Sequence, residues 1–191
     1  DAAHRMANLR GDVKIGGMGD TKELLLFRHA KSSRDDPDLD DFDRPLAERG
    51  VKDAPLIGRE LIARGWIPQM ALVSPAARTT ETWKLASAGM SPAPKVRSPE
   101  SLYLATSSRI LSEIAKTPET VERLVVVGHN PGMEELSRIL AGQRSDAAAR
   151  RLVDEKFPTG ALARFTFSGE WKDLAAGGTA LTHFLRPKDL G

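Results

Sequence analysis

Two short apolar runs in this chain each end in a polar cluster that contains a histidine. Leu24–Phe27 leads directly into Arg28 and His29, and Leu124–Val127 leads, one glycine later, into His129. Continuous apolar runs of this length predict strands buried on both faces, as in the centre of a parallel sheet. The polar clusters would then lie at the carboxyl ends of these strands.

Apolar residues recur at helical spacing in the stretches between the runs. The pattern predicts helices at residues 46–63, 76–88, 101–116 and 133–140. Pro55 falls inside the first helix, where we expect a kink or an early break, and Gly65 is placed to end it. Ser74 is the expected N-cap of the second helix, with Pro75 in its first turn. The third helix is expected to turn four side chains inward: Leu104, Ile110, Leu111 and Ile114.

Further strands are predicted between and after these helices. Met70–Val73 is a short apolar strand, and residues 95–97 form another; residues 161–167 alternate apolar and polar, with residues 180–185 as their partner. Alternating strands and helices indicate a mostly parallel sheet, and the alternating tail indicates an antiparallel edge. We therefore predict an α/β fold: one three-layer domain with a mostly parallel central sheet flanked by helices and an antiparallel edge from the C-terminal strands.

The length of 191 residues suits one such domain, which we place at residues 21–191 after an N-terminal extension at residues 1–20. The extension is charged and has no apolar segment typical of a secretory signal. Met18 stands just before the first strand, so we expect it to lie near the natural start. Much of Asp1–Gly17 would then come from an expression vector.

Composition narrows the function classes. Hydrophobic residues make up 40% of the chain and charged residues 28%, and the formal net charge is only +2, with no dense basic run that would favour nucleic acid. No apolar run approaches the roughly 18–20 residues needed to cross a bilayer. The absence of cysteine excludes a disulfide, a thiolate metal site and a thiol nucleophile. A cytoplasmic enzyme is the simplest setting.

Three predicted strand ends bring candidate catalytic residues to one edge of the sheet. They supply Arg28 with His29, Arg78 in the segment after Ser74, and His129. Ligands of open α/β sheets bind at this edge, and arginine can meet two phosphoryl oxygens at once. Two alternatives remain open: a first strand followed by a solvated basic loop, and, for each histidine taken alone, a hydrogen-bonded structural role.

A metal site is the obvious rival interpretation for two histidines. Such a site needs a third ligand and usually neighbouring carboxylates, whereas the neighbours here are arginines, whose charge repels a cation. We expect neither a metal nor a cofactor.

The ordered motifs resemble the histidine phosphatase superfamily, the phosphoglycerate-mutase-like fold. Its Arg-His-Gly motif is matched by Arg28-His29-Ala30, its Ser-Pro-x-x-Arg-x-x-x-Thr element by residues 74–82, and the element bearing its second histidine by residues 127–131. Arg44-Pro45-Leu46 followed by Gly50 also fits the pattern. The short chain and the form Arg-His-Ala-Lys-Ser are most similar to the SixA-type phosphohistidine phosphatases.

The resemblance implies roles for particular residues. His29 would be a nucleophile that is transiently phosphorylated, while Arg28, Arg78 and His129 would bind the phosphoryl oxygens. Many members use a carboxylate to protonate the leaving group, and Glu100 occupies the matching part of the chain, although it can also be read as a surface glutamate at a helix start. Lys31 and Asn130 are further candidates for substrate binding.

The spacing of the motifs also bears on the substrate. The gaps between them are short, and the acidic segment 35–43 is the one candidate rim, so an open site would admit a phosphorylated protein side chain. We predict a protein phosphohistidine phosphatase. The alternatives are a broad small-molecule phosphomonoesterase that requires Glu100, and an inert module that binds phosphate or a phosphoprotein.

Overall fold

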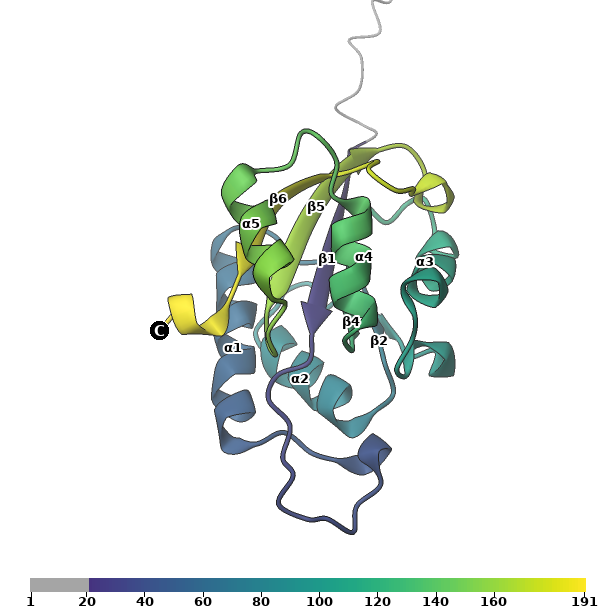
Figure 1. Ribbon diagram of the computed structural model, residues 1–191. Helices are drawn as coiled ribbons and strands as arrows, with labels where there is room; N and C mark the ends of the chain where they lie inside the picture. The colour runs from purple at the N-terminus through teal and green to yellow at the C-terminus, as the bar shows by residue number, and fades with distance from the viewer. Residues whose placement is uncertain (1–20) are drawn as a thin grey trace, which may run out of the picture.

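The computed structural model describes residues 21–191, in which six strands form one sheet with helices on both faces (Figure 1). The sheet order is β3-β2-β4-β1-β5-β6. The strands are β1 (Thr21–Arg28), β2 (Met70–Val73), β3 (Lys95–Arg97), β4 (Arg123–Gly128), β5 (Leu162–Ser168) and β6 (Ala180–Leu185). The N-terminal extension proposed for residues 1–20 lies outside the described residues.

Strand β1 occupies the centre of the sheet. It runs parallel to β4, with Phe27 opposite Val127, and antiparallel to β5, with Phe27 opposite Leu162. All four residues of Leu24–Phe27 are fully buried, as their continuous apolar run predicts. The pairing of β5 with β1 and with β6 is antiparallel, and the remaining pairs are parallel, so the predicted sheet is confirmed.

The helices form two outer layers because successive residues of β1 point to opposite faces of the sheet. Leu24 and Leu26 belong to the core beneath α3, α4 and α5, whereas Leu25 and Phe27 belong to the core beneath α1 and α2. The helices are α1 (Glu48–Ala63), α2 (Ala77–Ser87), α3 (Ser107–Ala115), α4 (Gly132–Leu140) and α5 (Ala147–Glu155). Four single 3₁₀ turns complete the fold: η1 (Asp41–Asp43), η2 (Glu100–Leu102), η3 (Trp171–Asp173) and η4 (Pro187–Asp189). The three-layer architecture is therefore confirmed.

Two of the predicted helices differ from the structure. Helix α1 continues through Pro55 without a break and ends before Gly65, whose φ is +73°. The carbonyl that Pro55 leaves without a donor belongs to Val51, an exposed position that water can reach. The helix predicted at residues 101–116 is instead η2 followed by α3, because Leu104 lies between them with φ +48° and an exposed side chain.

The prediction that Ser74 caps the N-terminus of α2 is wrong. Ala76 is the N-cap residue, and the Ser74 hydroxyl is instead bonded to His129. No helix among residues 21–191 is long and apolar enough to span a membrane.

Candidate active site

The carboxyl ends of β1, β2 and β4 lie level with one another and bring both histidines together. Arg28 is opposite Gly128 in the register of β1 and β4, and Val73 is opposite Val127 in that of β2 and β4. The residues that follow these strands therefore meet at one edge of the sheet. The imidazole rings of His29 and His129 are 5.4 Å apart between centroids, although 100 positions separate them in the chain.

His29 is held with one ring nitrogen free. Its Nδ1 lies 2.7 Å from the carbonyl oxygen of Ala30, and because a carbonyl only accepts, Nδ1 must carry the proton. Nε2 then keeps its lone pair. Burial, together with the positive charges of Arg78, Arg28 and Arg44, lowers the pKa of His29 to about 4 against the opposing hydrogen bond to Ala30. A neutral imidazole of this kind is a competent nucleophile.

His129 is more deeply enclosed, with only 3% of its surface exposed. Its Nε2 lies 2.7 Å from the Ser74 hydroxyl, and its Nδ1 is buried without a hydrogen-bond partner among the described residues. Burial and the neighbouring charges of Arg78 and His29 lower its pKa to about 3. Buried polar atoms without a hydrogen-bond partner are uncommon in proteins. His129 Nδ1 is one of two such atoms at this edge of the sheet, and the other belongs to Arg28.

Arg28 supplies the second of these atoms. Its Nη1 donates to the carbonyl oxygen of Phe157 at 2.9 Å, while its Nε is buried and has no partner in the described part of the chain. Arg78, in the first turn of α2, donates from Nη1 to the carbonyl oxygen of Asp41 (2.7 Å) and from Nη2 to its Oδ2 (3.0 Å). Both guanidinium groups thus retain N–H donors for an anion.

The backbone around His29 is fixed from two sides. The Thr82 hydroxyl accepts a hydrogen bond from the Ala30 amide (3.0 Å) and donates to the carbonyl oxygen of Arg78 (2.6 Å), so one side chain ties the segment after β1 to the first turn of α2. From the other side, the Gly160 amide donates to the carbonyl oxygens of Arg28 and His29. His29 and the neighbouring arginines are therefore held by elements from distant parts of the chain.

Three residues that the sequence analysis did not place in the site lie beside it. Arg44 donates to the Ser33 carbonyl oxygen (3.1 Å), to Asp41 Oδ1 (2.9 Å) and to the Ser32 hydroxyl. Tyr103 donates its hydroxyl to Asp41 Oδ2 and sets its ring edge-on to that of His129, with centroids 5.6 Å apart. Arg44 carried a signal, because it begins the matched Arg44-Pro45-Leu46 motif. Asp41 lies within the acidic segment that was predicted as a rim, but nothing singled it out there, and Tyr103 carried no signal.

The remaining candidates are Glu100, Lys31 and Asn130. Glu100 lies exposed at the start of η2, and the Lys31 side chain is exposed. Asn130 donates to the Phe157 carbonyl oxygen (3.0 Å) and accepts from the Glu134 amide (3.2 Å), so it also ties the segment between β4 and α4 to its surroundings. The roles of Glu100, Lys31 and Asn130 stay predictions.

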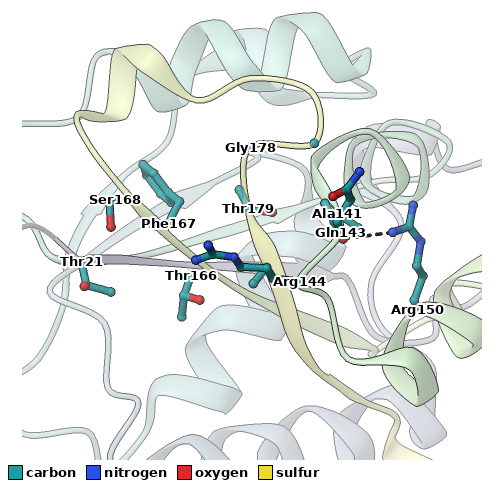
Figure 2. A pocket seen from close by; sticks show the side chains of 13 residues that line it. Thr21, Ala141, Gln143, Arg144, Arg150, Thr166, Phe167, Ser168, Gly178 and Thr179 are labelled. Carbon is teal, nitrogen blue, oxygen red and sulfur yellow. Dashed lines mark hydrogen bonds between the residues drawn. The ribbon is translucent and has the colours of Figure 1, made fainter.

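A separate hollow of about 890 Å³ lies at the opposite end of the sheet (Figure 2). Its wall includes Thr21 at the start of β1, Ser168 at the end of β5 and the exposed side chain of Arg144, which points across it. No histidine lines it. The histidines and arginines of the candidate active site lie at the other end of the strands, so this hollow is not the candidate active site.

The sheet order, with histidines following β1 and β4, defines the phosphoglycerate-mutase-like fold. No family model matches the chain. An uncharacterised protein of Mycobacterium tuberculosis is 39% identical over 163 residues, which are 85% of this chain and the whole of that protein. A solved structure from Nakamurella multipartita, provisionally assigned as phosphohistidine phosphatase SixA, is 30% identical with a TM-score of 0.77, over 87% of this chain and 96% of that one.

A second solved structure, the protein histidine phosphatase SixA complexed with tungstate, is 19% identical with a TM-score of 0.71, over 88% of this chain and 99% of that one, and shows the fold alone. The chain belongs to the histidine phosphatase superfamily and is similar to its SixA-type members.

Proposed function

We propose that this protein is a phosphatase that removes the phosphoryl group from a phosphorylated histidine of another protein, through a covalent phosphohistidine on His29. The observation that carries the proposal is the state of His29: a buried, neutral imidazole with Nε2 free, beside His129 and among arginines. Binding alone would not require a nucleophile in this setting, which argues against an inert phosphate-binding module.

The reaction divides into two displacements. In the first, the Nε2 lone pair of His29 forms a bond to phosphorus while the bond from phosphorus to the leaving nitrogen breaks, and that nitrogen takes up a proton. In the second, water attacks phosphorus, the bond to Nε2 breaks, and inorganic phosphate leaves with the proton balance completed by solvent. Arg28, Arg78 and His129 bind the phosphoryl oxygens, whose charge grows in the transition state.

The unsatisfied atoms of the site support these binding roles. Arg28 Nε and His129 Nδ1 are buried polar atoms without partners among the described residues, and an oxyanion would give each of them one if His129 presents Nδ1–H. Lys31, exposed two residues after His29, is a further proposed contact for the oxygens or for the surface of the substrate protein.

The substrate class follows from the position of the candidate acid. An imidazole leaves phosphorus more easily than an alkoxide does, so a phosphohistidine substrate lessens the need for a general acid. Glu100 lies at the start of η2 with its side chain exposed to solvent. A phosphomonoesterase that acts on small esters is the second candidate, and it would require Glu100.

Trapping the intermediate tests the mechanism. Wild-type protein mixed with a ³²P-labelled histidine-phosphorylated domain and quenched rapidly without acid is expected to carry label, whereas His29→Ala carries none. His183→Ala is the matched control, because His183 lies on β6 and contacts Trp66 instead of the site. Equal labelling of wild type and His29→Ala would contradict the catalytic role of His29.

Comparing substrates tests the proposed class. Turnover of the phosphohistidine domain is expected to exceed that of aryl phosphates, and Glu100→Gln is expected to change it less than threefold. Preference for the aryl phosphates, with a loss of at least tenfold in Glu100→Gln, would favour the phosphomonoesterase instead.

A further inference from the structure

Asp41 places a carboxylate on two arginines of the candidate active site. Its Oδ1 accepts from Arg44 Nη1 at 2.9 Å, and its Oδ2 accepts from Arg78 Nη2 at 3.0 Å and from the Tyr103 hydroxyl. The same residue also offers its backbone carbonyl oxygen to Arg78 Nη1 at 2.7 Å. One aspartate thus satisfies donors from three separate segments of the chain.

The donors that Asp41 engages face the reacting histidines. Arg44 and Arg78 both contribute the positive charge that lowers the pKa of His29, and the negative charge of Asp41 acts in the opposite direction on His129. The Tyr103 ring contacts that of His129. A carboxylate that accepts from two guanidinium groups and a hydroxyl has the donor pattern of a bound phosphoryl group, because carboxylate and phosphoryl oxygens share the geometry that arginine recognises.

Asp41 is also placed so that it can leave. Its side chain is 44% exposed, whereas that of Arg78 is 5% exposed. It lies in η1, a single turn with no buried residue, within the acidic segment 35–43. Removing the carboxylate without a replacement would leave the buried Arg78 charge uncompensated, which is costly. An arriving anion supplies that replacement.

We propose that Asp41 is an internal competitor at the anion site: its carboxylate occupies, in the free enzyme, the positions on Arg44 and Arg78 that phosphoryl oxygens take when substrate binds. The proposal rests on the anion site of the proposed function. Every anion that takes these positions must displace the same carboxylate. Asp41 thereby weakens the binding of each anion by the same factor, including the retention of the phosphate product.

Calorimetric titration with inorganic phosphate tests the exchange directly. Asp41→Asn keeps the shape of the side chain and removes its charge. We expect it to lower the Kd for phosphate about tenfold, the equivalent of one competing ion pair of about 1.4 kcal/mol. Asp43→Asn is the matched control: it removes the same charge from the same turn, but among residues 21–191 the Asp43 carboxylate forms no ion pair with an arginine. We expect less than a twofold change there.

Titration with formate, a monoanion, completes the experiment. Asp41→Asn is expected to lower the Kd for formate by about the same factor as the Kd for phosphate, because both anions are released from competition with the same carboxylate. An unchanged or raised Kd for phosphate in Asp41→Asn would overturn the proposal and would mean that Asp41 holds Arg78 in position. An equal gain in Asp43→Asn would overturn it in favour of general charge repulsion.

The same titration separates this inference from the proposed function. Inorganic phosphate is the product of any phosphatase reaction at this edge, so tightening in Asp41→Asn stands even if phosphohistidine proves not to be the substrate. If neither wild type nor Asp41→Asn binds phosphate, the anion site fails, and the inference is overturned together with the proposed function.

Discussion

His29 and His129 are expected to stay uncharged near pH 6.5, where an ordinary histidine begins to take up a proton. Both are buried beside arginines, and the pKa values fall from 6.5 to about 4 for His29 and to about 3 for His129. The nucleophile is therefore ready to attack throughout the neutral and mildly acidic range. An exposed histidine would be partly protonated there and unable to use both nitrogens.

Nitrogen-detected NMR of ¹⁵N-histidine-labelled protein checks this state. At pH 5.5 the His29 and His129 signals are expected to be those of neutral rings, with the proton of His29 on Nδ1, and His29→Ala assigns the signals by removing one set. A charged His29 at that pH would contradict the geometry described for its ring.

The lowered pKa of His29 makes the free energy of unfolding increase as the pH rises. Since the folded pKa of His29 lies below the unfolded value of 6.5, the unfolded chain binds more protons in this range. The contribution is fully present above pH 6.5 and is lost as the pH falls towards 4. The thermal unfolding temperature of His29→Ala is therefore expected to fall less steeply than that of wild type between pH 6.5 and pH 4. Parallel curves of unfolding temperature against pH would contradict this.

Thr82 shows how much the site depends on a residue that touches no substrate. Thr82→Val removes a hydroxyl that serves both the Ala30 amide and the Arg78 carbonyl oxygen while keeping the shape of the side chain. We expect a loss of stability of about 1–3 kcal/mol, because buried hydrogen-bonding groups lose their partner. We also expect a loss of activity, because the segments of His29 and Arg78 are no longer tied together.

Thr82→Ser, which keeps the hydroxyl, is the matched control and should recover most of the activity. Denaturant unfolding and the phosphohistidine assay measure the two effects. A Thr82→Val variant that loses stability and keeps full activity would show that Thr82 serves the fold alone.

At the scale of the element, α1 carries two glycines that permit close approach to different neighbours. A Cβ on Gly58 would lie 1.9 Å from the Ala86 carbonyl oxygen of α2, and one on Gly50 would lie 2.2 Å from the Lys31 carbonyl oxygen, two residues after His29. This contact explains why the motif that begins at Arg44 includes a glycine at position 50: the first turn of α1 packs directly against the backbone that follows His29.

Gly50→Ala and Gly58→Ala form a pair that separates packing from catalysis. Each is expected to cost at least about 2 kcal/mol in stability, since a backbone carbonyl cannot yield as a side chain does. Gly50→Ala alone should also lower activity, by at least tenfold, because it displaces the backbone beside His29. Val51→Ala, at an exposed position of the same helix, controls for helix substitution. Equal activity in the two glycine variants at a temperature where both are folded would contradict this coupling.

The elements that the sequence predicted correctly are those with a strong local pattern. The short, continuous apolar runs at 24–27, 70–73 and 124–127 indicate buried strands, and the structure confirms all three. Helix α5 was missed because its segment buries only Ala149 and Val153, too few for a clear period. The break at Leu104 was missed because a left-handed leucine is imposed by the surrounding fold and leaves no signal in the chain.

At the scale of the whole molecule, the convergence of Arg28, His29, Arg78 and His129 followed from one rule, that parallel strands open on the same edge. The contacts of Asp41 and Tyr103 did not follow, since they depend on where two connecting segments come to rest, which no periodicity encodes. The sequence thus predicted which arginines and histidines converge. Only the structure shows that the Asp41 carboxylate is hydrogen-bonded to Arg44 and Arg78.

The central position of β1 has a consequence for how the protein is made. Its two neighbours, β4 and β5, lie about 100 and 140 positions further along the chain. The apolar residues of β1 therefore stay uncovered until both of these strands have been synthesised, a condition that slows folding and favours aggregation. A chain ended at residue 156, which lacks β5, should accordingly remain sensitive to protease, whereas a chain that includes β5 and β6 becomes resistant. The strand that leads to His29 is thus synthesised well before the strands that cover it.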